Sequence, residues 1–293
     1  MQTSSATIHT APKDSATVII LRDSPGGPEV FLVRRHGLSD VLGGAHVFPG
    51  GKLDASDMQL KADVYLDQTL AQMHAALAEP QLDMAHGAGL YVAALREAFE
   101  ECGVLFAQDA TASQARQLAA LTQAGLPFNL ALAELGLRLR SSALLPWSRW
   151  ITPVSPAQPG KRFDTRFFAA ALPTGQDAVH DNVETTESVW LRPRAALEQY
   201  WDGAMQLAPP QIMTLAHLAH YPDVASVLQA RSNTPPPLVF PEAFEDQGER
   251  VVCYPGDVRH SVPMRVMPGP TRLRIRNKRF EPDEGFGALF DLR

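Results

Sequence analysis

The chain has 293 residues, of which 45% are hydrophobic and 20% charged, and its formal net charge is −6. This composition is typical of a soluble globular protein, and the acidic balance argues against a nucleic-acid-binding protein, which is normally basic. The N-terminus lacks a signal-peptide pattern, and no apolar run approaches the length of a membrane span. We therefore expect a cytoplasmic protein with neither a nucleic-acid nor a membrane partner.

The N-terminal part of the chain predicts a tail, a β hairpin and a helical segment. Residues 1–15 are polar and are expected to form a flexible tail. Two apolar runs flank a turn rich in Pro and Gly, which is typical of a hairpin, and a later stretch carries Ala, Leu, Met and Gln at helical spacing. We expect strands at residues 16–22, 30–35 and 47–48, and helical structure over residues 58–86 that ends near residues 87–89.

The rest of the chain alternates between helical and strand patterns, with a boundary at Thr234 and the three prolines after it. Helices are expected at residues 112–124, 130–135, 195–201, 210–220 and 223–231, and strands at 150–153, 166–171 and 188–191. Short β-like runs follow the boundary, at residues 238–240, 251–254, 271–280 and 288–292. The patterns thus predict a main domain at 16–232 and a β-rich C-terminal extension at 233–293.

Residues 96–104 form the most informative segment. On a helix, Glu97, Glu100 and Glu101 lie three and four positions apart, so their carboxylates converge on one face. Apolar side chains occupy the opposite face, and Gly103 is placed to end the helix. Neighbouring carboxylates repel one another, and a divalent cation with oxygen ligands removes that cost. The segment predicts a Mg²⁺ or Mn²⁺ site, and a solvated acidic face is the simpler alternative.

The order of residue types in this segment resembles the second half of the Nudix box, G-x5-E-x7-R-E-U-x-E-E-x-G-U, in which U is aliphatic. The first half is present but displaced. Gly51 ends the sequence Phe-Pro-Gly-Gly, and Asp57 stands in the first acidic slot. Residues 58–95 separate that slot from Arg96, which makes 38 residues where the box has seven, so 31 are inserted.

Such a split box is similar to that of the peroxisomal acyl-CoA diphosphatase branch of the Nudix hydrolases and its bacterial relatives. Residues 150–153 and 162–168 also look like that branch, and the resemblance covers roughly residues 15–222. It implies an α/β (α+β) fold, the Nudix α/β/α sandwich with a mixed β-sheet. Residues 58–88 would then be a helical insertion within the Nudix box, and we expect that insertion to lie beside the active site and to shape substrate choice.

The resemblance also implies roles for individual residues. Glu97, Glu100 and Glu101 would be metal ligands together with the carbonyl of Gly51 or Gly50, and Arg96 would orient one of the carboxylates. The role of Asp57 is open between a structural one and a catalytic one. Asp181 and Glu184 precede a predicted strand, and each is either a general base, an extra metal ligand or part of a polar turn.

Several cations are candidates for binding a phosphorylated substrate beside Gly50. Arg34 and Arg35 end a predicted strand, and arginine suits bidentate phosphate contacts. Arg162 and Arg166 are further candidates, although Arg166 can instead form a structural ion pair with Asp164. In the C-terminal extension, Arg and Lys alternate with apolar residues over 272–278, which predicts either a charged strand edge or a substrate or subunit contact.

The function implied is metal-dependent hydrolysis of a nucleoside diphosphate derivative, with CoA or acyl-CoA as the first candidate. The products would be 3′,5′-ADP and (acyl-)4′-phosphopantetheine. ADP-ribose, NADH or a dinucleoside polyphosphate is the alternative substrate, and a non-catalytic Nudix-fold binding module is the alternative class. A CoA-type upstream pattern keeps Arg35 and Gly44 but has Asp40 in an arginine slot. The sequence is also compatible with a homodimer.

Overall fold

The structure is a computed structural model, and it describes residues 11–37, 43–154, 162–181, 185–232 and 234–292. Most of the expected tail, together with Asp40 and Glu184, lies outside the described residues. Within that part of the chain, no helix is long and apolar enough to cross a membrane.

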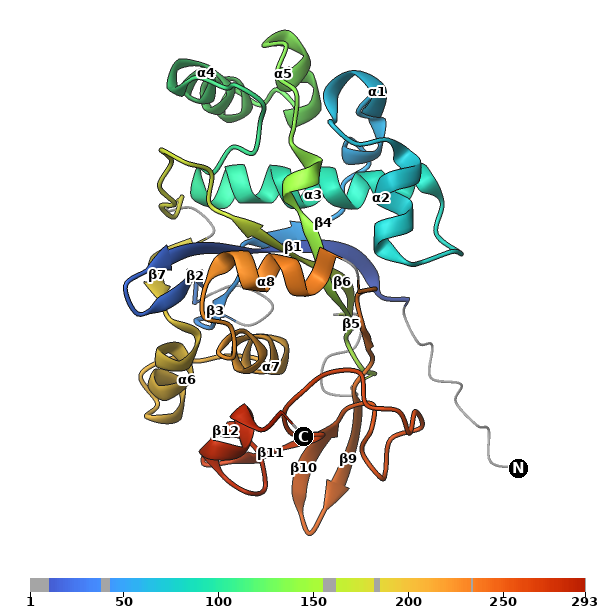
Figure 1. Cartoon of the computed structure of the whole chain (residues 1–293), viewed down its shortest axis with the longest axis vertical. Helices are drawn as coiled ribbons and strands as arrows, with labels where there is room; N and C mark the ends of the chain where they lie inside the picture. The colour runs from blue at the N-terminus through green and yellow to red at the C-terminus, as the bar shows by residue number, and fades with distance from the viewer. Residues whose placement is uncertain (1–10, 38–42, 155–161, 182–184, 233, 293) are drawn as a thin grey trace, which may run out of the picture.

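An eight-stranded mixed sheet forms the centre of the molecule (Figure 1). Its strands run in the spatial order β3-β2-β1-β6-β5-β8, while β4 pairs with β1 and β7 pairs with β2. Two pairings, β1 with β6 and β5 with β8, are parallel, and the others are antiparallel. The strands are β1 (Lys13–Ser24), β2 (Gly27–Arg35), β3 (His46–Val47), β4 (Gly50–Lys52), β5 (Leu145–Ile151), β6 (Phe163–Ala171), β7 (Thr185–Leu191) and β8 (Leu238–Val239).

Helices cover both faces of this sheet, which makes the α/β/α sandwich that the sequence predicts (Figure 1). The long helix α3 and four shorter helices lie on one face of the sheet, and three helices cover the other face. The first group is α1 (Ala62–Tyr65), α2 (Leu70–Leu77), α3 (Met84–Cys102), α4 (Ala112–Gln123) and α5 (Phe128–Glu134). The second group is α6 (Pro193–Trp201), α7 (Pro209–Leu218) and α8 (Val224–Ser232).

The alternation of side chains along β1 explains why two hydrophobic cores form. Val18 and Ile20 point into the core beneath α3, whereas Ile19 and Leu21 point into the core shared with α6, α7 and α8. All four side chains are fully buried. Because both faces of β1 are covered, its central run is apolar without interruption, as expected for a strand inside a sandwich.

The C-terminal extension forms a second, four-stranded antiparallel sheet in the order β12-β11-β10-β9. Its side chains Val252, Tyr254, Leu273 and Leu289 are buried in the same core as α6 and α7, so the extension packs on the main domain rather than standing apart from it. The elements are β9 (Glu242–Asp246), β10 (Glu249–Cys253), β11 (Arg272–Arg276), β12 (Arg279–Glu281) and the 3₁₀ helix η3 (Phe286–Phe290).

Several expected boundaries are wrong. β1 begins at Lys13, inside the expected tail, because its first residues pair with β6 and Ser15 with β4. Residues 288–292, expected as a strand, belong largely to η3, and the run 271–280 is a hairpin that turns at Asn277 and Lys278. Both turn residues have positive φ, as a two-residue hairpin turn requires.

The insertion is helical but shorter than expected. It contains the 3₁₀ helix η1 (Asp57–Gln59), α1 and α2, and α3 begins at Met84 and runs through Gly87–Gly89 without a break. Gly89 allows a close contact there, because a Cβ at this position would lie 2.7 Å from Cγ of Met58, which would have to shift. The glycines therefore bring the insertion against α3 instead of ending a helix.

Candidate active site

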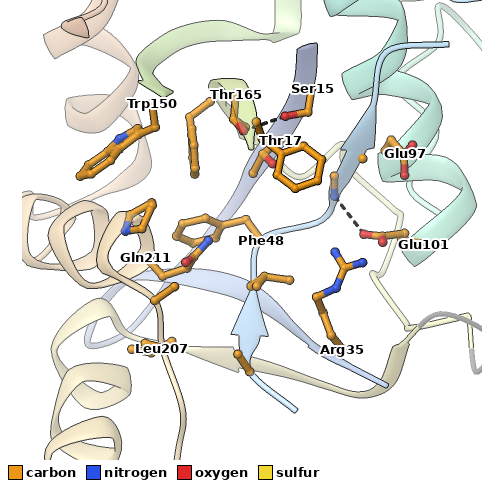
Figure 2. Close-up of a pocket in the computed structure, with 18 of the residues that line it drawn as sticks. Ser15, Thr17, Arg35, Phe48, Glu97, Glu101, Trp150, Thr165, Leu207 and Gln211 are labelled. Atoms are coloured by element: carbon orange, nitrogen blue, oxygen red, sulfur yellow. Dashed lines mark hydrogen bonds between the residues drawn. The ribbon is translucent and has the colours of Figure 1, made fainter. Parts of the chain in front are cut away.

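A cleft of about 1790 Å³ opens beside the N-terminal strands, and the acidic face of α3 lines one part of it. Glu97, Glu100 and Glu101 all line this cleft, as do Gly50, Gly51 and Arg35. The structure thus brings together the two halves of the motif that the insertion separates in sequence. Figure 2 shows Glu97, Glu101 and Arg35 gathered at one end, with Trp150, Gln211 and Leu207 at the other.

Helix α3 is held at both ends, which fixes the carboxylates. The side chain of Asp83 caps its start by accepting hydrogen bonds from the backbone N–H groups of Ala85 and His86, at 2.9 and 3.1 Å. Gly103 ends the helix in the left-handed conformation, with φ of 69°. In between, the apolar face of α3 is buried against the sheet, so the acidic face can only point toward the cleft.

The loop that contains Gly50 and Gly51 lies close to this acidic face, and each glycine approaches one glutamate. The backbone N–H of Gly50 donates a hydrogen bond of 2.9 Å to Oε2 of Glu101 (Figure 2). A Cβ on Gly51 would lie 2.2 Å from Oε1 of Glu97. A Cβ on Gly50 would lie 2.4 Å from the backbone carbonyl oxygen of Ala16, and Gly50 has a φ of +159°, so this position requires glycine. At Gly51 the new Cβ would instead displace the flexible Glu97 carboxylate.

Arg96 lies beneath the carboxylates and connects them to the insertion. Its Nη1 donates to Glu97 Oε1 and to Glu100 Oε2, both at 2.8 Å. Its Nε and Nη2 donate to the two oxygens of Asp57 at 2.9 and 3.1 Å, and Nη2 also reaches the carbonyl of Lys52 at 3.0 Å. All five N–H donors of the guanidinium group are thus used in hydrogen bonds. Arg96 therefore contacts two of the three carboxylates, Glu97 and Glu100.

The electrostatic state of this group follows from its partners. Burial alone would lower the pKa of Arg96, but the hydrogen bonds that it donates to Asp57 and the charges of Glu97, Asp57 and Glu100 raise the pKa well above its ordinary value. Loss of solvent raises the pKa of the partly exposed Glu100 carboxyl, against the opposing effect of Arg96. A second positive charge beside Glu100 would therefore favour its ionised form further.

Asp57 proves to be the buried partner of Arg96 rather than a group that faces the cleft. Its side chain is 2% exposed, and it also accepts a hydrogen bond of 2.9 Å from the backbone N–H of Asp54. Asp57 is not among the residues that line the cleft. Of the two roles left open by the sequence, the geometry supports the structural one.

Replacing Asp57 by alanine is expected to lower the free energy of unfolding by about 3–5 kcal/mol, because it leaves the buried Arg96 guanidinium without its main counter-charge. Urea denaturation measures the loss. The matched control is Glu198→Ala, which breaks an ion pair of 3.2 Å between side chains that are 52% and 61% exposed. That control should cost less than about 1 kcal/mol, and equal losses in the two variants would contradict the prediction.

Of the two arginines at the end of β2, one reaches the cleft. Successive strand residues point to opposite sides, and the pairing of β2 with β7 is also shifted between Arg34 and Arg35. Arg34 turns to the surface and forms an ion pair of 3.3 Å with Glu187. Arg35 lines the cleft, and its buried Nε has no hydrogen-bond partner among the described residues.

Arg162 and Arg166 do not line the cleft, which corrects their expected role in substrate binding. Arg166 is 3% exposed and donates to both oxygens of Glu79, at 3.0 and 2.7 Å, and to Asp14. Arg162 donates to the carbonyl of Thr152 at 3.0 Å. The Arg166 cluster ties the insertion, through Glu79, to strands β1 and β6.

The insertion itself supports α3 and does not line the cleft. None of the described residues 58–88 contributes to the cleft wall. Met73 and Leu77 of α2 are instead buried in the core beneath α3. A role of the insertion in substrate choice stays a prediction, and it would have to act through the position of α3, because its apolar side chains pack in the core and Glu79 forms ion pairs with Arg149 and Arg166.

The alternating cations of the C-terminal extension are mostly paired with acidic residues. Arg272 binds Asp257 at 2.7 Å, Arg274 binds Asp246 and Asp283 at 2.6 Å each, and Arg276 binds Glu249 at 2.8 Å. Lys278, at the hairpin turn, lines the cleft. The structural alternative thus holds for the three arginines and leaves Lys278 as a cleft-facing cation.

Asp181 lines the cleft, and its Oδ1 accepts hydrogen bonds from the backbone N–H and the hydroxyl of Thr185, at 3.1 and 2.7 Å. These bonds fit the polar-turn alternative. Because Asp181 also lies on the cleft wall, a role as a general base stays a prediction. Glu184 lies outside the described residues.

Sequence reasoning missed the far end of the cleft. Its wall includes Phe48, Trp150, Phe167 and Gln211, which come from four separated parts of the chain. Ser15 and Thr165 also line the cleft and share a hydrogen bond of 2.7 Å (Figure 2). No local spacing connects these positions, so a sequence pattern could not have grouped them.

Comparison with known proteins gives consistent matches. The NUDT19 Nudix domain family matches residues 5–218. The acyl-coenzyme A diphosphatase NUDT19 of Gallus gallus is 27% identical over 258 residues, which cover 71% of this chain and 68% of that protein. The protein of the same name from Xenopus laevis is 27% identical over 228 residues, which cover 66% of this chain and 60% of that protein.

A solved structure supports the same conclusion. The crystal structure of a Nudix hydrolase from Alicyclobacillus acidocaldarius matches with a TM-score of 0.61 and 26% identity, covering 77% of this chain and 99% of that one. The family match spans well over half of the chain, and the glycine loop and the acidic face of α3 lie together as the Nudix box requires. The chain therefore belongs to the Nudix hydrolases, in the NUDT19 branch, and is a Nudix diphosphatase.

Proposed function

We propose that the enzyme hydrolyses the diphosphate of CoA or an acyl-CoA and uses Mg²⁺ or Mn²⁺. The products would be 3′,5′-ADP and 4′-phosphopantetheine, with the acyl group retained where one is present. The observation that carries the chemistry is the approach of the Gly50–Gly51 loop to the acidic face of α3 inside a large cleft. The relatives named acyl-coenzyme A diphosphatases support the choice of substrate.

The donor set fits a divalent metal. Three glutamates from one helix face and the carbonyls of a glycine loop are hard oxygen donors, which Mg²⁺ and Mn²⁺ prefer. In the described part of the chain, no three acidic, His or Cys side chains are already gathered as a metal-holding group. Arg96 instead holds Glu97 and Glu100, and Gly50 holds Glu101. Glu97, Glu100 and Glu101 would hold the ion, with Gly51 beside them.

A bound divalent ion would neutralise the diphosphate oxygens and lower the pKa of the attacking water. The residues of this chain would then orient the groups around it. Arg96 fixes the rotamers of Glu97 and Glu100, and the Gly50 N–H fixes Glu101. Arg35 points its guanidinium into the same end of the cleft (Figure 2), where it can contact a phosphate oxygen.

The 3′-phosphate of CoA needs a cation of its own, since Asp40 stands where the upstream CoA-type pattern has an arginine. Lys278 is suited to this role because it is exposed and lines the cleft. The prediction is that kcat/KM for CoA exceeds that for dephospho-CoA and for ADP-ribose by about tenfold or more, as expected for one charge-assisted contact.

The comparison requires the three substrates to be assayed at one metal concentration, with product release followed by chromatography. Lys278→Met should narrow the difference between CoA and dephospho-CoA, while Lys13→Met, outside the cleft lining, should leave it unchanged. A preference for ADP-ribose, or indifference to the 3′-phosphate, would reject CoA as substrate and leave the diphosphatase chemistry intact.

A further inference from the structure

The far end of the cleft contains a polar group that no described residue engages. The side chain of Gln211 lines the cleft and is 6% exposed, and its Oε1 is buried without a hydrogen-bond partner. Leaving a buried acceptor unpaired destabilises a protein, so such a group in a cleft wall points to a ligand that donates to it. Rotation about the last side-chain bond of glutamine is only weakly restricted, so the amide can turn its oxygen toward a donor in the cleft.

The surroundings of Gln211 are flat and apolar. Gln211 lies in the first turn of α7, directly after Leu207, Ala208 and two prolines that line the same wall. Phe48, Trp150 and Phe167 line the cleft as well, and the rings of Phe48 and Phe167 meet edge to face with centroids 6.3 Å apart. Figure 2 shows Gln211, Phe48 and Trp150 on the side of the cleft away from Glu97 and Glu101.

We propose that Gln211 and these aromatic side chains form a nucleobase site that selects adenine by its exocyclic amine. A planar heteroaromatic ring fits a wall of aromatic residues, and the amine supplies the donor that Gln211 Oε1 lacks. The alkyl part of an acyl chain has no donor for that oxygen, and the pantetheine arm, which has amide donors, lacks a flat ring to pack on the aromatic wall. The glutamine amide can also donate from its nitrogen to an adenine ring nitrogen, which makes a bidentate contact.

This inference rests on the proposed diphosphatase function and adds the part of the substrate that lies away from the reacting phosphates. In this arrangement the nucleoside end of the substrate occupies the Gln211 end of the cleft, and the diphosphate lies at Arg35 and the glutamates. The pantetheine portion, with any acyl group, would then extend from the diphosphate in the direction away from Gln211. Gln211 is then a determinant of base specificity and takes no part in bond breaking.

The test compares substrates that differ in one group. The diphosphate substrate that the wild-type enzyme hydrolyses is prepared in two forms, one with adenine as its base and one with hypoxanthine, in which an oxo group replaces the amine. The value of kcat/KM is then measured for each form. The wild type should prefer adenine by about tenfold, the size expected for one hydrogen bond to a buried group. Gln211→Met should abolish the preference, mainly through KM, with kcat nearly unchanged.

Gln206→Met is the matched control, because Gln206 lines the same wall but is exposed; it should keep the wild-type preference. Calorimetric binding of ADP and IDP to the same proteins gives a second readout that needs no turnover. Equal affinity of the wild type for ADP and IDP, or a preference that survives in Gln211→Met, would overturn the nucleobase site. A preference for ADP without any hydrolysis would support the site and reject the proposed function.

Discussion

Replacing Glu100 or Glu101 by glutamine is expected to lower turnover at least about a hundredfold while the protein stays folded. The amide has the shape of the carboxylate but lacks its charge, so the substitution removes the electrostatic stabilisation of the metal and of the transition state. The hydrogen bonds argue that the fold will survive. Arg96 can still donate to an amide oxygen at position 100, and the N–H of Gly50 can do so at position 101.

Steady-state hydrolysis with Mg²⁺ and with Mn²⁺ measures the loss, and thermal unfolding checks the fold. Glu134→Gln is the matched control, because Glu134 is an exposed glutamate at the end of α5 and lies outside the cleft lining. Its turnover should stay within about twofold of the wild type. Full activity in either site variant, or in the wild type with excess chelator, would exclude a metal site on this helix face.

The helix and its acidic face were predictable because the information is local. The spacing of Glu97, Glu100 and Glu101 fixes one face, and Gly103 ends the helix where expected. The start of the helix was missed because Gly87 and Gly89 look like a break in sequence. The small residue at position 89 serves a tertiary contact instead, because Met58 packs where a Cβ of Gly89 would lie.

Charged residues away from the box were the least predictable. Arg34 and Arg35 look equivalent in sequence, yet strand alternation sends one to the surface and the other to the cleft. Arg166 was a substrate candidate, and its burial against Glu79 depends on a contact between residues 87 positions apart. No local pattern reports such a pairing, and the same holds for Gln211 and Phe48 at the far end of the cleft.

The second large effect is expected for Gly51→Ala, which should lower turnover about a hundredfold with little loss of stability. The new Cβ would lie 2.2 Å from Oε1 of Glu97, so one of the two must move. The carboxylate is the free end of a flexible side chain and will yield before the backbone does, which displaces a predicted metal ligand and leaves the core untouched.

Gly50→Ala provides the contrast, because its Cβ would lie 2.4 Å from the carbonyl oxygen of Ala16 and 2.7 Å from Cα of Thr17. Backbone atoms inside the sheet cannot yield, so this variant should lose stability as well as activity. Gly287→Ala is the neutral control, since no heavy atom lies within 4 Å of its Cβ and its φ is not in the left-handed region. Kinetics and urea denaturation of the three proteins separate the two effects. If Gly51→Ala retained full turnover, or lost as much stability as Gly50→Ala, the close approach of Glu97 to the glycine loop would have no part in catalysis.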